Sequence, residues 1–389
     1  MKKKNICIIS ECQQVPGIGG VETVSYILKK ELLKNGYFVW SLYFIPKAVP
    51  AINDIQFPQM HDICSKENKK QLIKTIEEKN IGYLLLQGTP KEGFLELCID
   101  VKKATGTKFI YTYHFNPLMC LKEFDDFKEK SLHECYFIVR PLYNLYLESK
   151  RSSFIRKSIN KFKDYDIKNI DAFVSVNKEH TAFFQTLYPK DFKSRFHTIM
   201  NPIVLEDYED NTVEKENIIL FVGRLTFQKR LDRLLRIWKE LQYIFNDWRV
   251  IVVGDGNYAS EYKRITTELK LQNIQYVGQQ PSENYFKKSK IVCMMSSHEA
   301  FGMVLVEAQK YGCVPIAYNS FETAPEIIQD GYNGILIEPF KQKEYTKALS
   351  KLITDKDYLE ELKSNGRSYI EKFNAKTIIK EWIKLLDSL

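Results

Sequence analysis

Residues 290–308, KIVCMMSSHEAFGMVLVEA, contain the pattern that decides the fold. The run Ile291–Met295 is apolar throughout rather than alternating, which is typical of a strand that is covered on both faces. A polar loop follows, and a second apolar stretch with helical spacing begins near Gly302. A covered strand that leads through a short loop into a helix is the repeating unit of a parallel α/β sheet.

The same unit recurs along all 389 residues of the chain. Apolar runs that predict covered strands alternate with longer segments of helical period, such as Leu231–Leu241. Such alternation predicts parallel sheets that are built from right-handed crossovers. The predicted strands are Asn5–Ser10, Tyr37–Phe44, Ile81–Gln87, Lys108–Tyr113, Asp171–Asn177 and Phe196–Met200, then Asn217–Gly223, Trp248–Gly254, Asn273–Val277, Lys290–Ser296, Cys313–Tyr318 and Gly334–Ile337.

The alternation stops near the middle of the chain and then restarts, which predicts two domains. Asn201-Pro202 closes the first series, residues 206–211 are polar without periodicity, and a new strand begins at Asn217. We therefore predict two doubly wound, Rossmann-like domains, at residues 1–205 and 206–374. Because such sheets bind ligands beyond the carboxyl ends of their strands, we expect a ligand cleft where the two domains face each other.

Composition narrows the class of protein. Hydrophobic residues make up 44% and charged residues 27%, as in ordinary globular proteins. No run approaches the roughly 18 apolar residues of a membrane span, so we predict a cytoplasmic protein. The eight cysteines form no C-x-x-C pair, which predicts free thiols rather than a metal site. The net charge of +8 suits several anionic partners, but no nucleic-acid-binding motif accompanies it.

Residues 119–168 interrupt the alternation with a basic, aromatic-rich stretch. Such a stretch can lie on an anionic membrane surface, which would make the protein peripheral at the inner face of the membrane. It can equally be a packed helical excursion with a solvated basic face. The sequence leaves both interpretations open.

Two segments that follow a first strand are candidates for binding phosphate. Gly19 and Gly20 precede a helix, where glycine amides can approach an anion, although a tight turn is the simpler alternative. Gly223 precedes Arg224 and Lys229, whose cations are unfavourable beside a helix amino end unless an anion is bound there. Ordinary surface charge is the alternative at this second segment.

Glu299 and Glu307 form the most informative pair. Glu299 lies in the loop after a covered strand, and Glu307 falls in the second turn of the next helix, where side chains lean towards the helix start. Both carboxylates can accept hydrogen bonds from hydroxyls of one extended polar ligand. The backbone amides of residues 301–304 (Phe301, Gly302, Met303 and Val304) can donate hydrogen bonds to its phosphate. The alternative is that the glutamates only favour the helix dipole.

His114 ends a further covered strand, in the segment Tyr111-Thr112-Tyr113-His114. A lone histidine is often a satisfied structural residue. Its place at the carboxyl end of the strand favours a role facing a ligand.

At these positions the sequence resembles the retaining glycosyltransferases of family four, which have the two-domain GT-B fold. The resemblance covers nearly the whole chain. It rests on Gly19-Gly20-Val21-Glu22, on Phe221-Val222-Gly223-Arg224 with Lys229, and on the E-x7-E spacing from Glu299 to Glu307. Asn201-Pro202, Ala324-Pro325-Glu326 and Gly331-Tyr332-Asn333-Gly334 also fit.

The resemblance implies a role for each matched residue. Glu307 would bind the ribose of a nucleotide diphosphate sugar, and Glu299 the sugar hydroxyls beside the Phe301–Val304 backbone. Arg224 and Lys229 would neutralise the diphosphate, Gly19 and Gly20 would close over it, and His114 would lie near the sugar C6. The donor would be linked to UDP or GDP, no metal or other cofactor would be needed, and residues 375–389 would cross back to the first domain.

The activity implied is transfer of a hexose-type sugar to a hydroxyl of a glycan or lipid-linked glycan, with retention of configuration, in surface polysaccharide or glycolipid synthesis. The alternatives are a sugar-nucleotide epimerase, a glycan phosphorylase and a non-catalytic sugar-nucleotide-binding module. Arg230 departs from the family pattern, because many relatives have glycine after the lysine. The sequence gives no indication of the oligomeric state.

Overall fold

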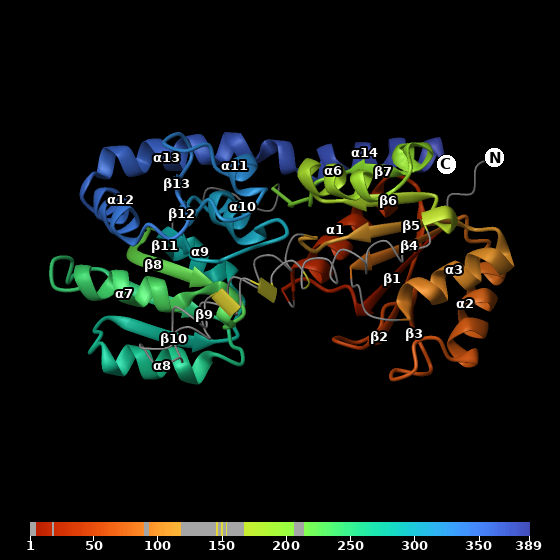
Figure 1. The fold of residues 1–389 in the computed structure, drawn as a ribbon, viewed down its shortest axis with the longest axis horizontal. Helices are drawn as coiled ribbons and strands as arrows, with labels where there is room; N and C mark the ends of the chain where they lie inside the picture. The colour runs from red at the N-terminus through yellow and green to blue at the C-terminus, as the bar shows by residue number, and fades with distance from the viewer. Residues whose placement is uncertain are drawn as a thin grey trace. The chain divides into compact units, whose positions relative to one another are not determined.

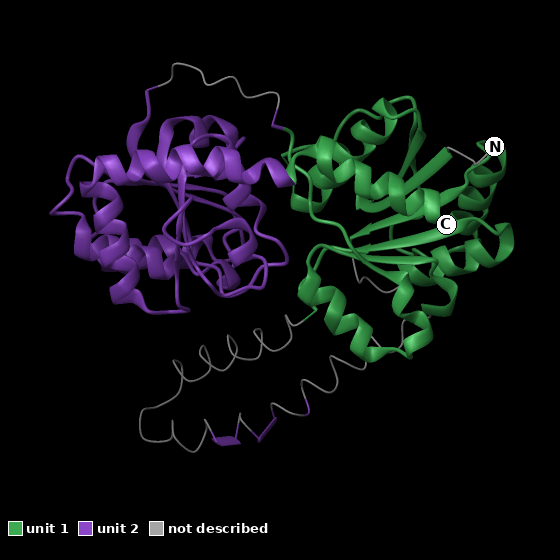
Figure 2. Ribbon diagram, turned by 90° about the horizontal axis from the view of Figure 1, so that it is seen from above, with its two compact units in different colours: residues 1–117, 156–204, 373–389 green, residues 118–155, 205–372 purple. Residues whose placement is uncertain are grey.

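The structure is a computed structural model that describes residues 5–17, 19–88, 93–117, 145–146, 149–150, 153, 167–205 and 214–389. Contacts divide the chain into two compact units, shown in Figure 2. The first unit contains the chain up to Pro117, the segment that ends at Val204, and Phe373–Leu389; the second contains Leu205–Lys372.

The basic stretch at residues 119–168 lies almost wholly outside the described residues, so its contact with membrane or acceptor stays a prediction. Among the residues that are described, no helix has the length and apolar character that crossing a membrane requires.

The first unit is built on a parallel sheet in the order β3-β2-β1-β4-β5-β6-β7 (Figure 1). Each predicted strand of this half is present, with bounds that move by a few residues. The three-residue strand β3 is additional, because so short a run carries no periodic signal. The bounds are β1 (Asn5–Cys12), β2 (Phe38–Ile45), β3 (Asp54–Gln56), β4 (Tyr83–Gly88), β5 (Lys108–Tyr113), β6 (Ala172–Ser175) and β7 (Phe196–Thr198).

Helices cover both faces of this sheet, which is why its strands read as continuous apolar runs. Ile6 and Ile8 pack with α1 and α14, whereas Cys7 and Ile9 point to the other face, where α2, α3 and α6 lie. The helix bounds are α1 (Gly20–Lys34), α2 (Lys66–Glu78), α3 (Phe94–Thr105), α6 (Lys178–Leu187) and α14 (Ala375–Ser388).

The last helix, α14, completes the core of the first unit rather than that of the second. Ile203 N donates to Phe373 O at 2.8 Å, so the chain returns beside the point at which it left. The Tyr83 hydroxyl donates to Leu386 O at 2.9 Å, and the Trp382 side chain is buried against α1. The end of the chain therefore belongs structurally with its beginning.

The second unit repeats this design with a parallel sheet in the order β10-β9-β8-β11-β12-β13. Its strands, β8 (Glu216–Val222), β9 (Arg249–Val253), β10 (Ile274–Gly278), β11 (Ser289–Met294), β12 (Val314–Tyr318) and β13 (Ile335–Ile337), follow the predicted set. Helices α7 (Leu231–Leu241), α8 (Ala259–Glu268) and α12 (Gln342–Thr354) pack on one face. Helices α9 (Glu283–Lys288) and α10 (Met303–Lys310) pack on the other, and α11 (Ala324–Ile327) and α13 (Lys356–Tyr369) complete the unit.

Each sheet has one point where the strand order reverses, between β1 and β4 in the first unit and between β8 and β11 in the second. The loops that leave two such neighbouring strands turn towards opposite faces of the sheet. This divergence leaves the carboxyl edge open at the reversal, which is where doubly wound sheets bind their ligands. The predicted fold class is thus confirmed, and the fold selects two places for a site.

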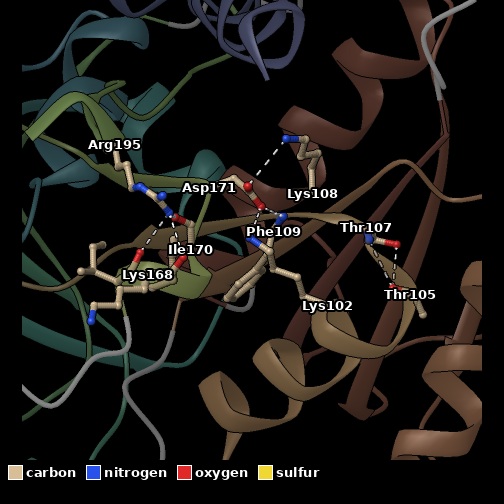
Figure 3. A network of polar contacts seen from close by, with 10 residues as sticks. Lys102, Thr105, Thr107, Lys108, Phe109, Lys168, Ile170, Asp171 and Arg195 are labelled. Atoms are coloured by element: carbon tan, nitrogen blue, oxygen red, sulfur yellow. Dashed lines mark hydrogen bonds and ion pairs between the residues drawn. The ribbon is translucent and has the colours of Figure 1, made fainter. Parts of the chain in front are cut away.

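A polar network at the opposite, amino edge fastens β5 to β6 (Figure 3). Asp171 Oδ2 accepts from Lys102 Nζ at 2.6 Å and from the Phe109 amide at 2.8 Å. Arg195 Nη1 donates to the carbonyl oxygens of Lys168 and Ile170, at 3.1 and 2.5 Å. These bonds hold the chain where it re-enters the sheet after the excursion.

We expect Asp171→Ala to lower the free energy of unfolding by about 2 kcal/mol, because it removes a half-buried ion pair and leaves a backbone amide without its acceptor. Urea denaturation measures the loss. Asp100→Ala is the matched control, because its ion pair with Lys69 is exposed and such pairs contribute less than about 1 kcal/mol. Equal losses in the two variants would contradict the structural role of Asp171.

Candidate functional site

At the strand-order reversal of the second unit, the loop after β8 is packed backbone to backbone against the loop after β9. Gly254 has a φ of 136°, and a Cβ on it would lie 2.0 Å from the carbonyl oxygen of Gly223. Gly223 N donates to Val253 O at 3.0 Å, and Leu225 N donates to Asp255 O at 2.9 Å. Only glycine fits at residue 254, so the path of the chain towards Arg224 is fixed.

Gly223 makes room for Lys229. A Cβ on Gly223 would lie 3.4 Å from Lys229 Cε, and its φ of 152° is one that side chains rarely adopt. The lysine stem can therefore pass over the end of β8. The Arg224 side chain is exposed, and no described residue forms a hydrogen bond or ion pair with it.

Arg230 departs from the pattern of the family that the sequence resembles, and its backbone has a conformation that suits glycine. Its φ of 49° and ψ of 41° are left-handed, a conformation that costs other residues about 1–2 kcal/mol. The guanidinium is held by Asp232, 3.2 Å from Nε, and lies over the Phe227 ring at 4.7 Å. These contacts compensate for the missing glycine and keep the loop geometry.

Gln228 ties this loop to the loop after β11. Its carbonyl oxygen accepts from the Ser297 amide at 2.9 Å, and its Nε2 donates to His298 O at 2.6 Å. Ser320 adds a third anchor, because its hydroxyl donates to Ser296 O at 2.6 Å. Two segments that are about 70 residues apart in sequence are thereby held side by side.

The result is a direct contact between two of the predicted site residues. Lys229 Nζ lies 2.5 Å from Glu299 Oε1. The two side chains are only 17% and 13% exposed, so their charges are poorly screened by water. The sequence places each residue at the carboxyl edge, but it does not indicate that they pair.

Helix α10 begins beside this ion pair. Gly302 has a φ of 94°, and a Cβ on it would lie 3.0 Å from the Phe321 ring. The Thr323 hydroxyl donates to Phe301 O at 2.7 Å and fixes the residue before it. The first-turn amides of a helix, here those of Met303 and Val304, have no partner within the helix and favour an anion.

Glu307 lies in the second turn of α10, and no described residue donates a hydrogen bond to its carboxylate. Burial raises the pKa of this carboxyl to about 6, although the charge of Lys310 partly opposes the shift. Above pH 6 the protein thus holds a partly buried carboxylate that accepts no hydrogen bond from the described residues. Such a group is destabilising unless a ligand supplies donors.

In the first unit the glycine segment opens α1 at the reversal between β1 and β4. A Cβ on Gly19 would meet Glu22 Oε2 at 2.3 Å, whereas nothing lies within 4 Å of a Cβ on Gly20. Gly88, which ends β4 with a φ of 107°, allows Val21 to approach closely. Sequence reasoning missed Gly88, although a glycine that ends an apolar run is a signal for close approach.

His114 follows β5 and is nearly buried, with 8% of its surface exposed. Its Nε2 lies 2.5 Å from Gln87 Oε1, so Nε2 carries the proton in the neutral ring. Burial lowers the pKa of His114 to about 4, and Asn201 partly opposes the shift. The ring is neutral at pH 7. Gln87 was also missed, although it is the polar residue that ends the apolar run Leu84–Leu86.

The predicted residues thus fall into two groups. Gly223, Lys229 and Glu299 are in contact or nearly so, and Arg224, Glu307 and residues 301–304 belong to the same edge of the second sheet. Gly19, Gly20 and His114 lie at the carboxyl edge of the first sheet. The cleft between the two domains stays a prediction.

A cavity of about 560 Å³ lies away from these residues, at the amino ends of β8 and β11. Its lining includes Glu216, Asp247 and Lys290, so charges of both signs balance, and it offers no focus for an anionic ligand. Among the residues that the structure describes, no group of three or more histidine, cysteine, aspartate or glutamate side chains is placed to hold a metal ion.

We expect Gly254→Ala to lower the free energy of unfolding by about 2 kcal/mol or more, because the added Cβ collides with the Gly223 carbonyl. Thermal or urea denaturation measures the change. Gly20→Ala is the control, since its Cβ would meet nothing and its stability should stay within about 0.5 kcal/mol of the wild type. A fully stable Gly254→Ala protein would contradict the packing of these loops.

Glu307→Gln should stabilise the protein by about 1 kcal/mol near neutral pH. The folded carboxyl has a pKa near 6 against an ordinary 4.5, so the folded state binds more protons in this window and loses stability as pH rises through it. The amide carries no such penalty. The difference in unfolding free energy should therefore grow between about pH 4.5 and 7. A difference that does not depend on pH would show that the carboxylate is not desolvated.

The comparisons with known proteins point to one class of enzyme. Residues 206–369 match the family model described as "Glycosyl transferases group 1". The match covers the second unit and contains Arg224, Lys229, Glu299 and Glu307.

Curated relatives agree with this match. Over 207 residues the chain is 26% identical to the GalNAc-alpha-(1->4)-GalNAc-alpha-(1->3)-diNAcBac-PP-undecaprenol alpha-1,4-N-acetyl-D-galactosaminyltransferase of Campylobacter jejuni, covering 51% of this chain and 56% of that protein. It is 28% identical over 186 residues to the amylovoran biosynthesis glycosyltransferase AmsD of Erwinia amylovora, covering 47% and 52%. The chain thus spans about half the length of these relatives.

Solved structures share the fold across the whole chain. Anabaena HepE in complex with UDP and glucose superposes with a TM-score of 0.74 at 15% identity, covering 99% of this chain and 100% of that one. The lipopolysaccharide outer core galactosyltransferase WaaB gives 0.64 at 17% identity, covering 99% of each chain. The fold is therefore of the GT-B type, and the comparisons support a glycosyltransferase.

Proposed function

We propose that the protein transfers a hexose-type sugar from a nucleotide diphosphate sugar to a hydroxyl acceptor, with retention of configuration, in the synthesis of a surface polysaccharide or glycolipid. The observation that carries the proposal is the grouping of charges at the strand-order reversal of the second sheet. There Lys229, Arg224 and the amino end of α10 can attract anions, and the carboxylates of Glu299 and Glu307 can accept hydrogen bonds from hydroxyls.

The cations fit the diphosphate of the donor. The exposed guanidinium of Arg224 has no described partner and can bind two phosphate oxygens at once. Lys229 supplies a point charge, and its side chain can pass close to residue 223 because glycine has no Cβ there. When the bond from the sugar to phosphate breaks, negative charge develops on the leaving diphosphate. Cations and first-turn amides that are already in place stabilise that charge without reorganisation.

The carboxylates fit the two hydroxyl-bearing parts of the donor. No described residue donates a hydrogen bond to the Glu307 carboxylate, and the two hydroxyls of a ribose would supply such donors. Glu299 lies in the preceding loop and suits the hydroxyls of the sugar itself. We assign the ribose to Glu307 and the sugar to Glu299, with the backbone of residues 301–304 along the phosphates.

The chemistry then needs no protein nucleophile. The acceptor hydroxyl attacks the anomeric carbon on the face from which the diphosphate leaves, and the departing phosphate takes the proton of that hydroxyl. His114 is neutral at pH 7, and Nε2 already donates to Gln87. We therefore assign His114 to hydrogen bonding with the sugar near C6 rather than to proton transfer.

The remaining assignments follow from resemblance alone. We propose that Gly19 and Gly20 close over the diphosphate and that the acceptor is a glycan or a lipid-linked glycan. One relative is named for a glycan acceptor linked to undecaprenol and another for amylovoran biosynthesis, and these names support this class of acceptor. UDP is the first nucleotide to test, because Anabaena HepE and the pneumococcal transferase GtfA were solved with it.

A thermal-shift panel of UDP-glucose, UDP-galactose, UDP-N-acetylglucosamine and GDP-mannose tests the proposal. One donor at 100 times its Kd should stabilise the wild type by about 2.7 kcal/mol. Lys229→Met should remove most of that shift, because the diphosphate loses its buried cation. Arg236→Met is the control, since it removes an exposed charge from α7 and should leave the shift unchanged. If no sugar nucleotide shifts the wild type, the proposed donor is wrong.

The product separates transfer from the alternatives. In the absence of an acceptor, a transferase passes the sugar slowly to water and releases it with the anomeric configuration of the donor, which NMR detects. An epimerase would instead return an altered sugar nucleotide, and a binding module would leave the donor intact. Release of the inverted anomer would contradict retention.

A further inference from the structure

The loop between β2 and the edge strand β3 exposes two aliphatic side chains almost completely. Its sequence, residues 46–53, is PKAVPAIN. Val49 is 91% exposed and Ile52 is 100% exposed, so no neighbouring side chain covers either of them. Because they are three residues apart, their Cα atoms lie within about 11 Å of each other. The protein thus presents two adjacent apolar side chains to its surroundings on one short loop.

A buried glutamine holds the start of this loop. The Gln13 side chain is 1% exposed, and its Oε1 accepts from Lys47 N at 2.9 Å and from Ala48 N at 2.8 Å. Its Nε2 donates to Asp54 Oδ2 at 3.0 Å, on the residue that follows the loop. One side chain therefore ties the beginning of the loop to its end.

Asp54 holds the second half of the loop. Its Oδ1 accepts from Lys29 Nζ at 2.7 Å, and both side chains of this ion pair are largely buried. Its Oδ2 accepts from the Ala51 amide at 3.2 Å, and its own amide donates to Ala51 O at 2.9 Å. Pro46 and Pro50 further restrict the backbone, because their rings fix φ. The loop is thereby prevented from folding over its own apolar side chains.

The size and the charge of this surface favour one kind of partner. A stable protein interface buries about 800 Å² on each partner, which is far more than this loop offers. Fully exposed side chains also line no pocket for a small ligand. Lys47 is the one charged residue of residues 46–53, and it is exposed. A cation beside exposed aliphatic side chains suits an anionic lipid surface, where apolar groups enter the interface and the cation meets the headgroups.

We propose that residues 46–53 form a membrane-binding loop, in which Val49 and Ile52 enter the apolar boundary of an anionic lipid bilayer and Lys47 contacts the headgroups. This contact is separate from the basic stretch at residues 119–168 and needs no sugar nucleotide. A bilayer at this loop would hold lipid-linked acceptors beside the first unit, a consequence that rests on the proposed function.

Quenching by brominated acyl chains tests the insertion directly. Ile52→Trp places an indole on the loop, and Ile244→Trp is the matched control, because Ile244 is a 68% exposed aliphatic residue that follows α7 in the second unit. Both variants are mixed with vesicles of brominated phosphatidylglycerol and phosphatidylcholine in equal parts, and the emission of the wild type is subtracted. The added indole of Ile52→Trp should lose most of its emission, whereas that of Ile244→Trp should lose none.

Vesicle flotation of serine variants measures the contribution to binding. The double variant Val49→Ser, Ile52→Ser should bind the same vesicles about tenfold more weakly, because two buried aliphatic side chains are lost. Tyr243→Ser with Ile244→Ser is the control, since these side chains are 64% and 68% exposed, and its binding should stay within about twofold of the wild type. Both double variants should keep the thermal shift that the donor gives.

Quenching confined to Ile52→Trp, with weaker flotation of the Val49 and Ile52 double variant alone, supports the membrane-binding loop. The proposal is overturned if the wild type does not bind the vesicles, if both tryptophan variants are quenched equally, or if the double variant floats as the wild type does. Each of these results leaves the proposed function intact, because donor binding is measured without lipid.

Discussion

The charged groups of the second unit depend on one set of hydrogen bonds, those that Gln228 makes with the loop after β11. Through its carbonyl and its side-chain amide, this residue holds Ser297 and His298 against the loop that carries Lys229. The ion pair between Lys229 and Glu299 joins the same two loops. A cation and a carboxylate from distant parts of the sequence thereby share one partly desolvated position.

The strand order explains why the link is needed there. At the reversal between β8 and β11, the loops that follow the two strands leave the sheet in opposite directions, so the carboxyl edge opens there. Glycines at 223, 254 and 302 allow a lysine side chain, a backbone carbonyl and an aromatic ring, respectively, to approach the backbone closely at this edge. Strained or unpartnered groups are concentrated in this place, as at Arg230 and Glu307, and such groups are typical of sites that a ligand completes.

Much of this could be predicted from the sequence because parallel strands that are covered on both faces leave a strong signal. The strands of both sheets, the helix Leu231–Leu241 and the loop position of Glu299 all follow from continuous apolar runs and their breaks. Side-chain contacts between residues that are far apart in sequence leave no such signal. The contact of Lys229 with Glu299, the part of Gln228 and the neutral state of His114 beside Gln87 depend on residues that are far apart in sequence. Strand β3 was not predicted, because three residues are too few to show a periodic pattern.

The central claim is that a sugar nucleotide binds at the carboxyl edge of the second sheet, and hydrogen–deuterium exchange with and without a saturating donor tests it most directly. Exchange should be slower in peptides that cover residues 223–230 and 296–308, where the proposed phosphate-binding and hydroxyl-binding groups lie. Peptides at the amino edge, around Glu216 and Trp248, should be unaffected. Protection at the amino edge, with none at the two loops, would contradict the claim.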